Sequence, residues 1–221
     1  MLGKLVEMKK LFYTPIWKYE YVDFKKDEDF LLEYFTRDEH YISEREQNGL
    51  QITRANLHKD PALKKLTDFI ISCAEDAMDQ MGYEPKCGIT SLWATRQRLG
   101  GFHHRHHHVN SFLGGVFHLY DHDSCASGTV FYNQDSSKYV IQPAIQTDKE
   151  QMFSYREVMK FDPGHFHIFP AWAQHDTMPS KSQYRIVAAT NIMPIGMTNK
   201  DHFDRYNYPD PSGMTLKEYK G

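Results

Sequence analysis

The stretch FHHRHHHVNSFLGGVFHL, residues 102–119, places five histidines within six positions and continues directly into an apolar segment. In an extended strand, successive side chains alternate between the two faces. One face would then carry His104, His106 and His108, and the other His103, Arg105 and His107. An H-x-H pair holds two imidazoles side by side, and imidazole is a ligand for iron, zinc, copper and nickel. The run therefore predicts a metal site that needs a third group from elsewhere in the chain.

The segments after this run resemble short strands separated by turns. Each is apolar or alternating and is bounded by glycine, proline or polar clusters. The predicted strands are residues 89–97, 111–119, 128–134, 138–146, 165–170 and 184–193. Such a series of short strands is typical of a sandwich or barrel.

The segments before the run favour helices. Residues 61–81 have apolar side chains at helical spacing, with Asp60 as a cap, Pro61 in the first turn and Gly82 at the end. A shorter helix is expected at 28–35. Residues 11–17 are expected to form an edge strand, because Pro15 cannot donate a ladder hydrogen bond.

Two helices followed by many short strands predict an α+β fold, with the helices buttressing a jelly-roll core. The chain has 221 residues and a net charge of −3, so we expect one domain over residues 1–195, a polar arm over 196–221 and no nucleic-acid partner. No segment has the length and apolarity of a membrane span or secretory signal, which predicts a cytoplasmic protein. Cys73, Cys87 and Cys125 are scattered and are expected to be reduced thiols.

A third metal ligand is expected from a different strand, near the end of the series of predicted strands. His175 follows the 165–170 strand and a turn, and Arg185 enters the last predicted strand ten residues later, in a segment that is apolar on both faces. A buried arginine needs a partner, and a carboxylate that accepts two hydrogen bonds is the natural one. The partner is either a distant Asp or Glu in a structural ion pair or the carboxylate of a ligand.

The segments HHHVNSFLGGVFHL, FPAWAQH and YRIVAATNI, in this order and spacing, resemble the Fe(II)- and 2-oxoglutarate-dependent oxygenases, in particular a small branch common in phages and marine bacteria. The resemblance implies a double-stranded β-helix, which is a cupin-like jelly roll. It also implies metal ligands at His106, His108 and His175, and a grip by Arg185 on the distal carboxylate of 2-oxoglutarate. His118 stands where relatives have a tyrosine that helps hold this carboxylate.

Two positions depart from the pattern of the family. The wider superfamily usually has His-x-Asp or His-x-Glu with a distal histidine, whereas His108 occupies the carboxylate position here. His108 either completes a three-histidine site or leaves its place to water, and pairing through His104 is a further alternative. Near His118, Gly114 and Gly115 are expected either to let the backbone approach a ligand or to mark a bulge.

The resemblance implies the cofactors Fe(II) and 2-oxoglutarate, with ascorbate as the in-vitro reductant. The implied reaction hydroxylates a C–H bond of a peptidyl or small-molecule substrate and releases succinate and CO2. Trp93, Phe102, Trp172 and residues 134–160 are candidate walls of the substrate site. No membrane partner is expected, and a homodimer is one expected assembly.

Three other classes of protein account for part of the pattern. A cupin-like metalloenzyme with a three-histidine site and no 2-oxoglutarate explains the histidines but gives Arg185 no role. A zinc hydrolase needs a general base beside the metal, which the pattern does not supply. A non-enzymatic metal-binding protein predicts no cosubstrate binding at all.

Overall fold

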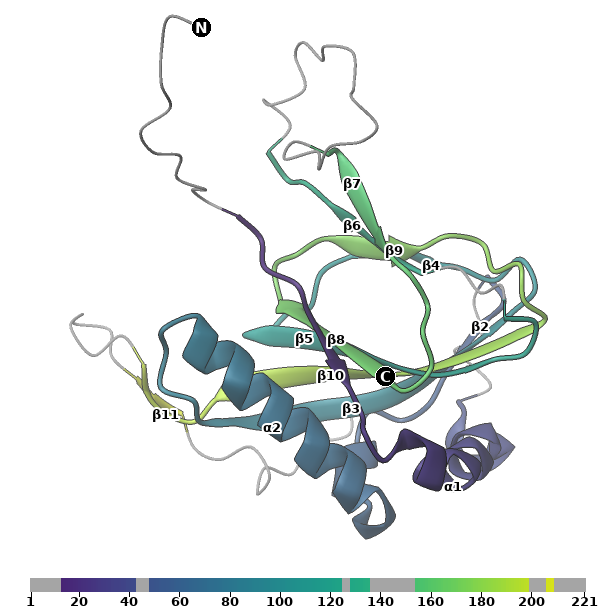
Figure 1. Ribbon diagram of the computed structural model, residues 1–221, viewed down its shortest axis with the longest axis horizontal. Coiled ribbons are helices and arrows are strands. Elements are labelled where there is room, and N and C mark those ends of the chain that lie inside the picture. Colours follow the sequence, from purple (N-terminus) through teal and green to yellow (C-terminus); the bar gives the residue numbers. More distant parts are fainter. Residues whose placement is uncertain (1–12, 43–47, 125–127, 136–153, 199–205, 209–221) are drawn as a thin grey trace, which may run out of the picture.

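The computed structural model describes residues 13–42, 48–124, 128–135, 154–198 and 206–208. Within these residues the fold is α+β, with two antiparallel sheets facing each other and helices outside the larger one (Figure 1). The predicted strand at 138–146, Cys125, part of the 134–160 segment and most of the 196–221 arm lie outside the described residues. No helix in the described part of the chain is long and apolar enough to cross a membrane.

Both predicted helices are present. They are α1 (Phe24–Thr36) and α2 (Lys64–Gln80), and the short 3-10 turns are η1 (Asp38–His40), η3 (Leu57–Lys59) and η4 (Pro61–Leu63). The Asp60 carboxylate accepts a hydrogen bond from the Ala62 amide at 2.9 Å, as expected of a cap. The chain leaves α2 through Gly82, whose φ of +80° suits glycine. The predicted end of this helix is therefore confirmed, whereas its predicted first turn is the 3-10 turn η4, which Asp60 caps, and α2 itself begins at Lys64.

The larger sheet has six strands in the order β1-β8-β5-β10-β3-β2. These strands are β1 (Trp17–Glu20), β2 (Leu50–Ile52), β3 (Cys87–Arg98), β5 (Leu113–Asp121), β8 (His165–Pro170) and β10 (Tyr184–Pro194). The edge strand expected at 11–17 begins later, at Trp17, so Pro15 precedes the strand. Every residue of the edge strand β1 therefore has a backbone N–H group that can donate a hydrogen bond.

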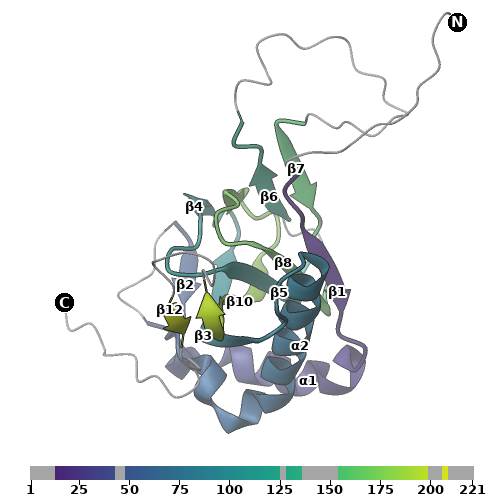
Figure 2. The same ribbon diagram turned by 90° about the vertical axis from the view of Figure 1, so that its left-hand side faces the viewer.

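The smaller sheet has four strands in the order β4-β9-β6-β7. These are β4 (His103–His106), β6 (Thr129–Tyr132), β7 (Arg156–Met159) and β9 (His175–Thr177). A separate hairpin pairs β11 (Gly196–Thr198) with β12 (Tyr206–Tyr208). Figures 1 and 2 show the smaller sheet on the side of the larger sheet that faces away from α1 and α2.

Strand alternation divides the core into two layers. On β5, Phe117 packs toward the helices with Ile70 of α2, while its neighbour Val116 packs between the two sheets with Phe169 and Val187. The larger sheet is thus covered on both faces, which explains why its strands are apolar on both faces in the sequence. The space between the sheets is where the inward side chains of β3, β5, β8 and β10 meet those of β4, β6 and β9.

Candidate metal centre

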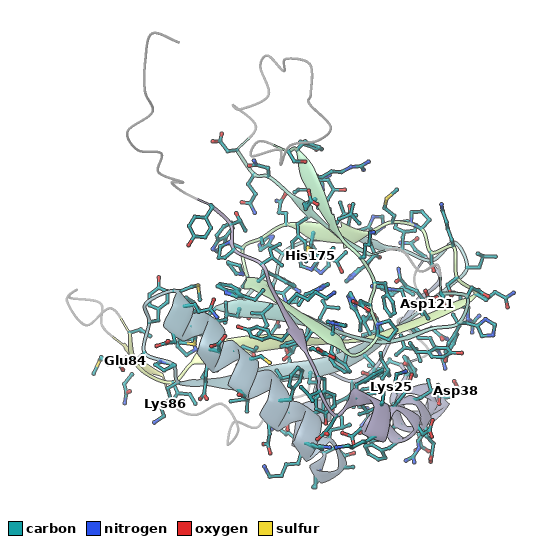
Figure 3. The ribbon with its side chains drawn as sticks, viewed as in Figure 1. Lys25, Asp38, Glu84, Lys86, Asp121 and His175 are labelled. Atoms are coloured by element: carbon teal, nitrogen blue, oxygen red, sulfur yellow. The ribbon has the colours of Figure 1, made fainter. Side chains whose placement is uncertain are left out.

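Three histidines, two from neighbouring strands of the smaller sheet and one from the residues just after β4, meet between the sheets. His106 ends β4, His175 begins β9, and the two are Cα partners in the antiparallel ladder. His108 follows β4, and its amide donates to the Ala171 carbonyl at 2.9 Å. One nitrogen from each ring lies within 4.8 Å of the others. Figure 3 shows His175 in the space between the sheets.

An irregularity in β4 changes which histidines point inward. His103 pairs with Thr177 and His106 with His175, so three steps along β4 match two steps along β9. As a result His103 and His106 both line the same pocket, which corrects the strict alternation expected from the sequence. His104 is exposed, and its Nε2 lies 2.9 Å from the Asn48 amide nitrogen. The structure therefore places His104 outside the cluster, which disfavours a ligand pair through it.

The Nδ1 atoms of all three clustered rings have oxygen partners. His106 Nδ1 donates to the His104 carbonyl at 2.8 Å, and His175 Nδ1 donates to the Ala173 carbonyl at 2.9 Å. His108 Nδ1 donates to the Asn191 side-chain oxygen at 2.5 Å. An imidazole with its proton on Nδ1 has its lone pair on Nε2. The three Nε2 atoms are therefore the atoms available to a metal, held by the outer hydrogen bonds that metal-binding histidines usually have.

The surroundings keep these rings neutral. Burial, together with a smaller effect of neighbouring histidines, lowers the pKa of His175 from 6.5 to about 2 and that of His108 to about 4. The pKa of His106 is also lowered by burial. A neutral imidazole is the form that binds a metal. The apo-protein at neutral pH thus presents its donor atoms without first having to lose protons.

The three histidines share a pocket of about 430 Å³, a volume that includes its open mouth. Its described lining combines residues of both sheets with no Asp or Glu among them: Leu50, Trp93, Thr95, Gln97, His103, His106, His108, Val116, Thr129, His175, Thr177, Arg185, Val187 and Ala189. Of the predicted walls, Trp93 is in this lining, whereas Trp172 is 52% exposed. Phe102 is outside the described lining as well.

Arg185 is the cation of this pocket, and it is 2% exposed. Its Nη1 donates to the Gln97 side-chain oxygen, while Nε and Nη2 have no hydrogen-bond partner among the described residues. Burial lowers its pKa from 12.5 to about 10, and the charge of Asp121, its Cα partner on β5, acts in the opposite direction. Unpartnered buried donors on a cation are costly. They indicate that Arg185 is oriented for an anion that enters the pocket.

Gln97 is a site residue that the sequence pattern did not reveal. It is 1% exposed, accepts from Arg185, and donates through Nε2 to the Gly101 carbonyl and to Thr177 Oγ1 at 2.8 Å. Thr177 Oγ1 in turn accepts from the His103 amide. Glutamine in an apolar strand carries no specific signal, although its inward position on β3 follows from alternation once the register is known. Gln97 links the arginine to the strand that carries His106.

His118 is fully buried on β5 but is not in the described pocket lining. Its Nδ1 accepts from the Asp162 amide at 3.0 Å, and its ring stacks on Phe161, which also contacts the Arg185 guanidinium. Its Nε2 has no described hydrogen-bond partner. The structure thus places His118 near Arg185 behind Phe161, and its predicted contact with a cosubstrate stays a prediction.

The two glycines on β5 make room for side chains of the protein. A Cβ on Gly114 would lie 2.6 Å from Phe169 and 3.0 Å from His108, and one on Gly115 would lie 2.4 Å from Phe166. The register irregularity between β5 and β10 lies elsewhere, at Ile186/Val187. Neither glycine marks that bulge. At both glycines, side-chain rings of the protein itself lie close against the backbone.

Comparison with solved structures agrees with the fold. The structure is similar to a Pseudomonas putida prolyl-4-hydroxylase (TM-score 0.58, 10% identity, covering 82% of this chain and 93% of that one). HygX from Streptomyces hygroscopicus, solved with nickel, 2-oxoglutarate and hygromycin B, gives a TM-score of 0.57 at 14% identity over 89% of this chain and 92% of that one. The epimerase SnoN from nogalamycin biosynthesis gives 0.59 at 13% identity, over 90% and 82%. At these identities the likeness supports the fold, and the predicted double-stranded β-helix is confirmed.

Sequence comparison gives a family. No curated protein matches the chain. Residues 91–191 match the sequence model of the family described as "Putative 2OG-Fe(II) oxygenase". The matched range begins in β3, ends in β10 at Asn191, and contains the three clustered histidines and Arg185. The resemblance drawn from the sequence is thereby confirmed: residues 91–191 match the model of a 2OG-Fe(II) oxygenase family.

Proposed function

We propose that this protein is an Fe(II)- and 2-oxoglutarate-dependent dioxygenase that hydroxylates a C–H bond of a peptidyl or small-molecule substrate. The observation that carries the proposal is the shared pocket. It combines three Nε2 donors with a buried arginine that has two unpartnered nitrogens. Such a pocket offers one end to a metal and the other to an anion. A keto acid with a second, distal carboxylate fits both ends.

The residues present fit the cofactors that the family description names. Three imidazoles on one side of an ion suit iron, and they leave further coordination positions for other ligands. Arg185 suits a carboxylate because its planar fork can donate two parallel hydrogen bonds. The proposed ligands are accordingly His106, His108 and His175, with Arg185 at the distal carboxylate and His118 in support through Phe161.

In this mechanism the protein positions and shields the reactants. When bound, Fe(II) and 2-oxoglutarate supply the oxidising chemistry, in which the keto acid is converted to succinate and CO2 and an oxygen atom enters a C–H bond. Arg185 fixes the far end of the keto acid, and Gln97 holds the guanidinium in place. Trp93, Val187 and Ala189 form apolar walls that exclude water around the histidines. The substrate that is to be hydroxylated enters through the open mouth of the pocket.

The neighbours support a broad substrate class. They include a prolyl-4-hydroxylase, HygX with hygromycin B bound and an epimerase of nogalamycin biosynthesis, so their names cover chemically different molecules. Peptidyl and small-molecule substrates are therefore both included in the proposal. In the described lining, a substrate group close to the histidines would contact apolar side chains and His103. It would contact no carboxylate.

Release of succinate tests the proposal without knowledge of the substrate. Oxygenases of this kind turn over 2-oxoglutarate slowly when uncoupled, so protein with Fe(II), ascorbate and air is expected to form succinate above a no-protein control. The His175→Ala variant is expected to form none above that control. Anaerobic addition of 2-oxoglutarate to the Fe(II) protein is expected to give a weak visible metal-to-ligand band. Absence of both succinate and band in iron-loaded protein would exclude the proposed function.

A second candidate follows from the ligand set itself. Three histidines without a carboxylate also suit a cupin-like dioxygenase that does not use 2-oxoglutarate. Such an enzyme requires the metal but has no need of Arg185. It therefore predicts metal binding without succinate and without any effect of 2-oxoglutarate on thermal unfolding.

Gln97→Leu tests how Arg185 is held. Leucine has a similar size but cannot accept from the guanidinium, which leaves Nη1 without its described partner. We expect 2-oxoglutarate binding to the Mn(II) protein to weaken by about 0.5–1.5 kcal/mol, the net value of one hydrogen bond. Titration calorimetry measures the affinity, and Gln51→Leu, which removes the glutamine bonded to Arg96 on the helix side of β3, is the matched control. Equal affinities in Gln97→Leu and the parent would remove Gln97 from this role.

A further inference from the structure

The third histidine of the cluster differs from the other two in how it is held. His106 and His175 each donate from Nδ1 to the carbonyl of the residue two positions earlier, so the local backbone fixes both rings. His108 donates to a side chain 83 positions away, Asn191 on β10 in the opposite sheet. Its ring is therefore held from the opposite sheet, by the Asn191 side chain and by an interaction with the backbone of Thr190.

The strand next to Asn191 provides the space for this contact. Gly114 of β5 is the Cα partner of Asn191, and a Cβ on Gly114 would lie 3.0 Å from His108 Nδ1. It would also lie 2.6 Å from the Phe169 ring, which packs edge-on against His108. Any side chain at this position would push His108 and Phe169 away. The glycine lets the ring approach the sheet closely enough for Asn191 to reach it.

An irregularity in the neighbouring strand β3 lies beside Asn191. The register between β10 and β3 shifts between Asn191 and Ile192: Asn191 pairs with Ser91, and Ile192 pairs with Ile89. Bulges next to functional sites commonly change the direction of a side chain. Here the irregularity coincides with the residue that accepts from His108.

We propose that Asn191 is a positioning residue that makes His108 the third metal ligand, by accepting its Nδ1 proton and leaving Nε2 for the ion. This inference rests on the proposed three-histidine centre and deepens it. A histidine at this position needs an acceptor beyond its ring and a neighbour without a side chain, and Asn191 and Gly114 supply these two conditions. The pair thus accounts for how the ring of His108 is held at this position.

Metal titration of paired variants tests the proposal. Asn191→Leu keeps the approximate size but removes the acceptor, whereas Asn191→Asp keeps an acceptor oxygen. We expect Asn191→Leu to weaken Mn(II) binding 10–100-fold, the usual effect of losing a second-layer partner, and Asn191→Asp to bind at least as tightly as the parent. The Co(II) absorption bands should stay at the parent positions in Asn191→Asp and shift in Asn191→Leu.

Two controls separate the possible failures. Thr190→Val removes a neighbouring buried hydrogen bond, from Thr190 to the Ser91 carbonyl, and should leave metal affinity unchanged. His108→Ala tests the ligand itself. If His108→Ala binds Mn(II) as tightly as the parent, the three-histidine centre is wrong. If His108→Ala loses affinity while the two Asn191 variants match each other, whether both are unchanged or both are equally weakened, the centre stands and the role of Asn191 is wrong.

Discussion

The His175→Ala and His106→Ala proteins are expected to lose stoichiometric binding of Fe(II) and Mn(II). Each removes one of three donors that lie within 4.8 Å of one another, and the described pocket lining offers no carboxylate as a substitute. We expect affinity to fall by more than about 100-fold, which exceeds the usual effect of losing a second-layer partner. Metal analysis after gel filtration and Mn(II) titration by calorimetry measure this loss.

Folding must be measured separately in these variants. His175 is 3% exposed and packs against Phe169 and Phe131, so its truncation leaves a cavity that lowers stability. The readout that isolates the ligand role is the rise in unfolding temperature on adding Mn(II), which should disappear. His107→Ala is the matched control, since His107 belongs to the same run but is exposed and lies outside the cluster. Parent-like metal binding by His106→Ala and His175→Ala would contradict the proposed site.

Replacement of Arg185 is expected to separate cosubstrate binding from metal binding. Arg185→Lys keeps the charge but loses the planar fork, and we expect the affinity for 2-oxoglutarate in the Mn(II) protein to fall by about 1–3 kcal/mol. Arg185→Leu removes the charge too and should abolish measurable binding. Mn(II) affinity should be unchanged in both variants, because Arg185 is not in the histidine cluster.

The stability of the apo-protein gives a second readout of the same residue. Arg185 is buried with two unpartnered nitrogens, so an apolar side chain of similar volume removes an unfavourable burial. We expect apo Arg185→Leu to unfold at the same temperature as the parent or higher. Arg96→Lys is the control, because Arg96 lies one position away in register, faces the helix side and pairs with Asp38. Unchanged affinity for 2-oxoglutarate in Arg185→Lys would remove Arg185 from the site.

Local patterns in the sequence were sufficient for the elements and for the ligand types. Helical spacing with the Asp60 cap predicted α2, and period-two or apolar segments predicted β3, β5, β6, β8 and β10. The order of the H-x-H pair, His175 and Arg185 was enough to indicate the family, since the chemistry of the residues and their spacing are both properties of the sequence. The fold class followed from the same patterns.

What the sequence could not decide is which side chains of neighbouring strands meet. The shift between β4 and β9 turned His103 inward and left His104 outside, against strict alternation. Gln97 beside Arg185 and Asn191 beside His108 depend on cross-strand register, since the partners are 88 and 83 positions apart in the sequence. Alternation along one strand is a local steric effect, whereas register and bulges come from packing between distant segments. The sequence by itself therefore determined the strands and the donor types, and only the tertiary structure decided which donors face one another.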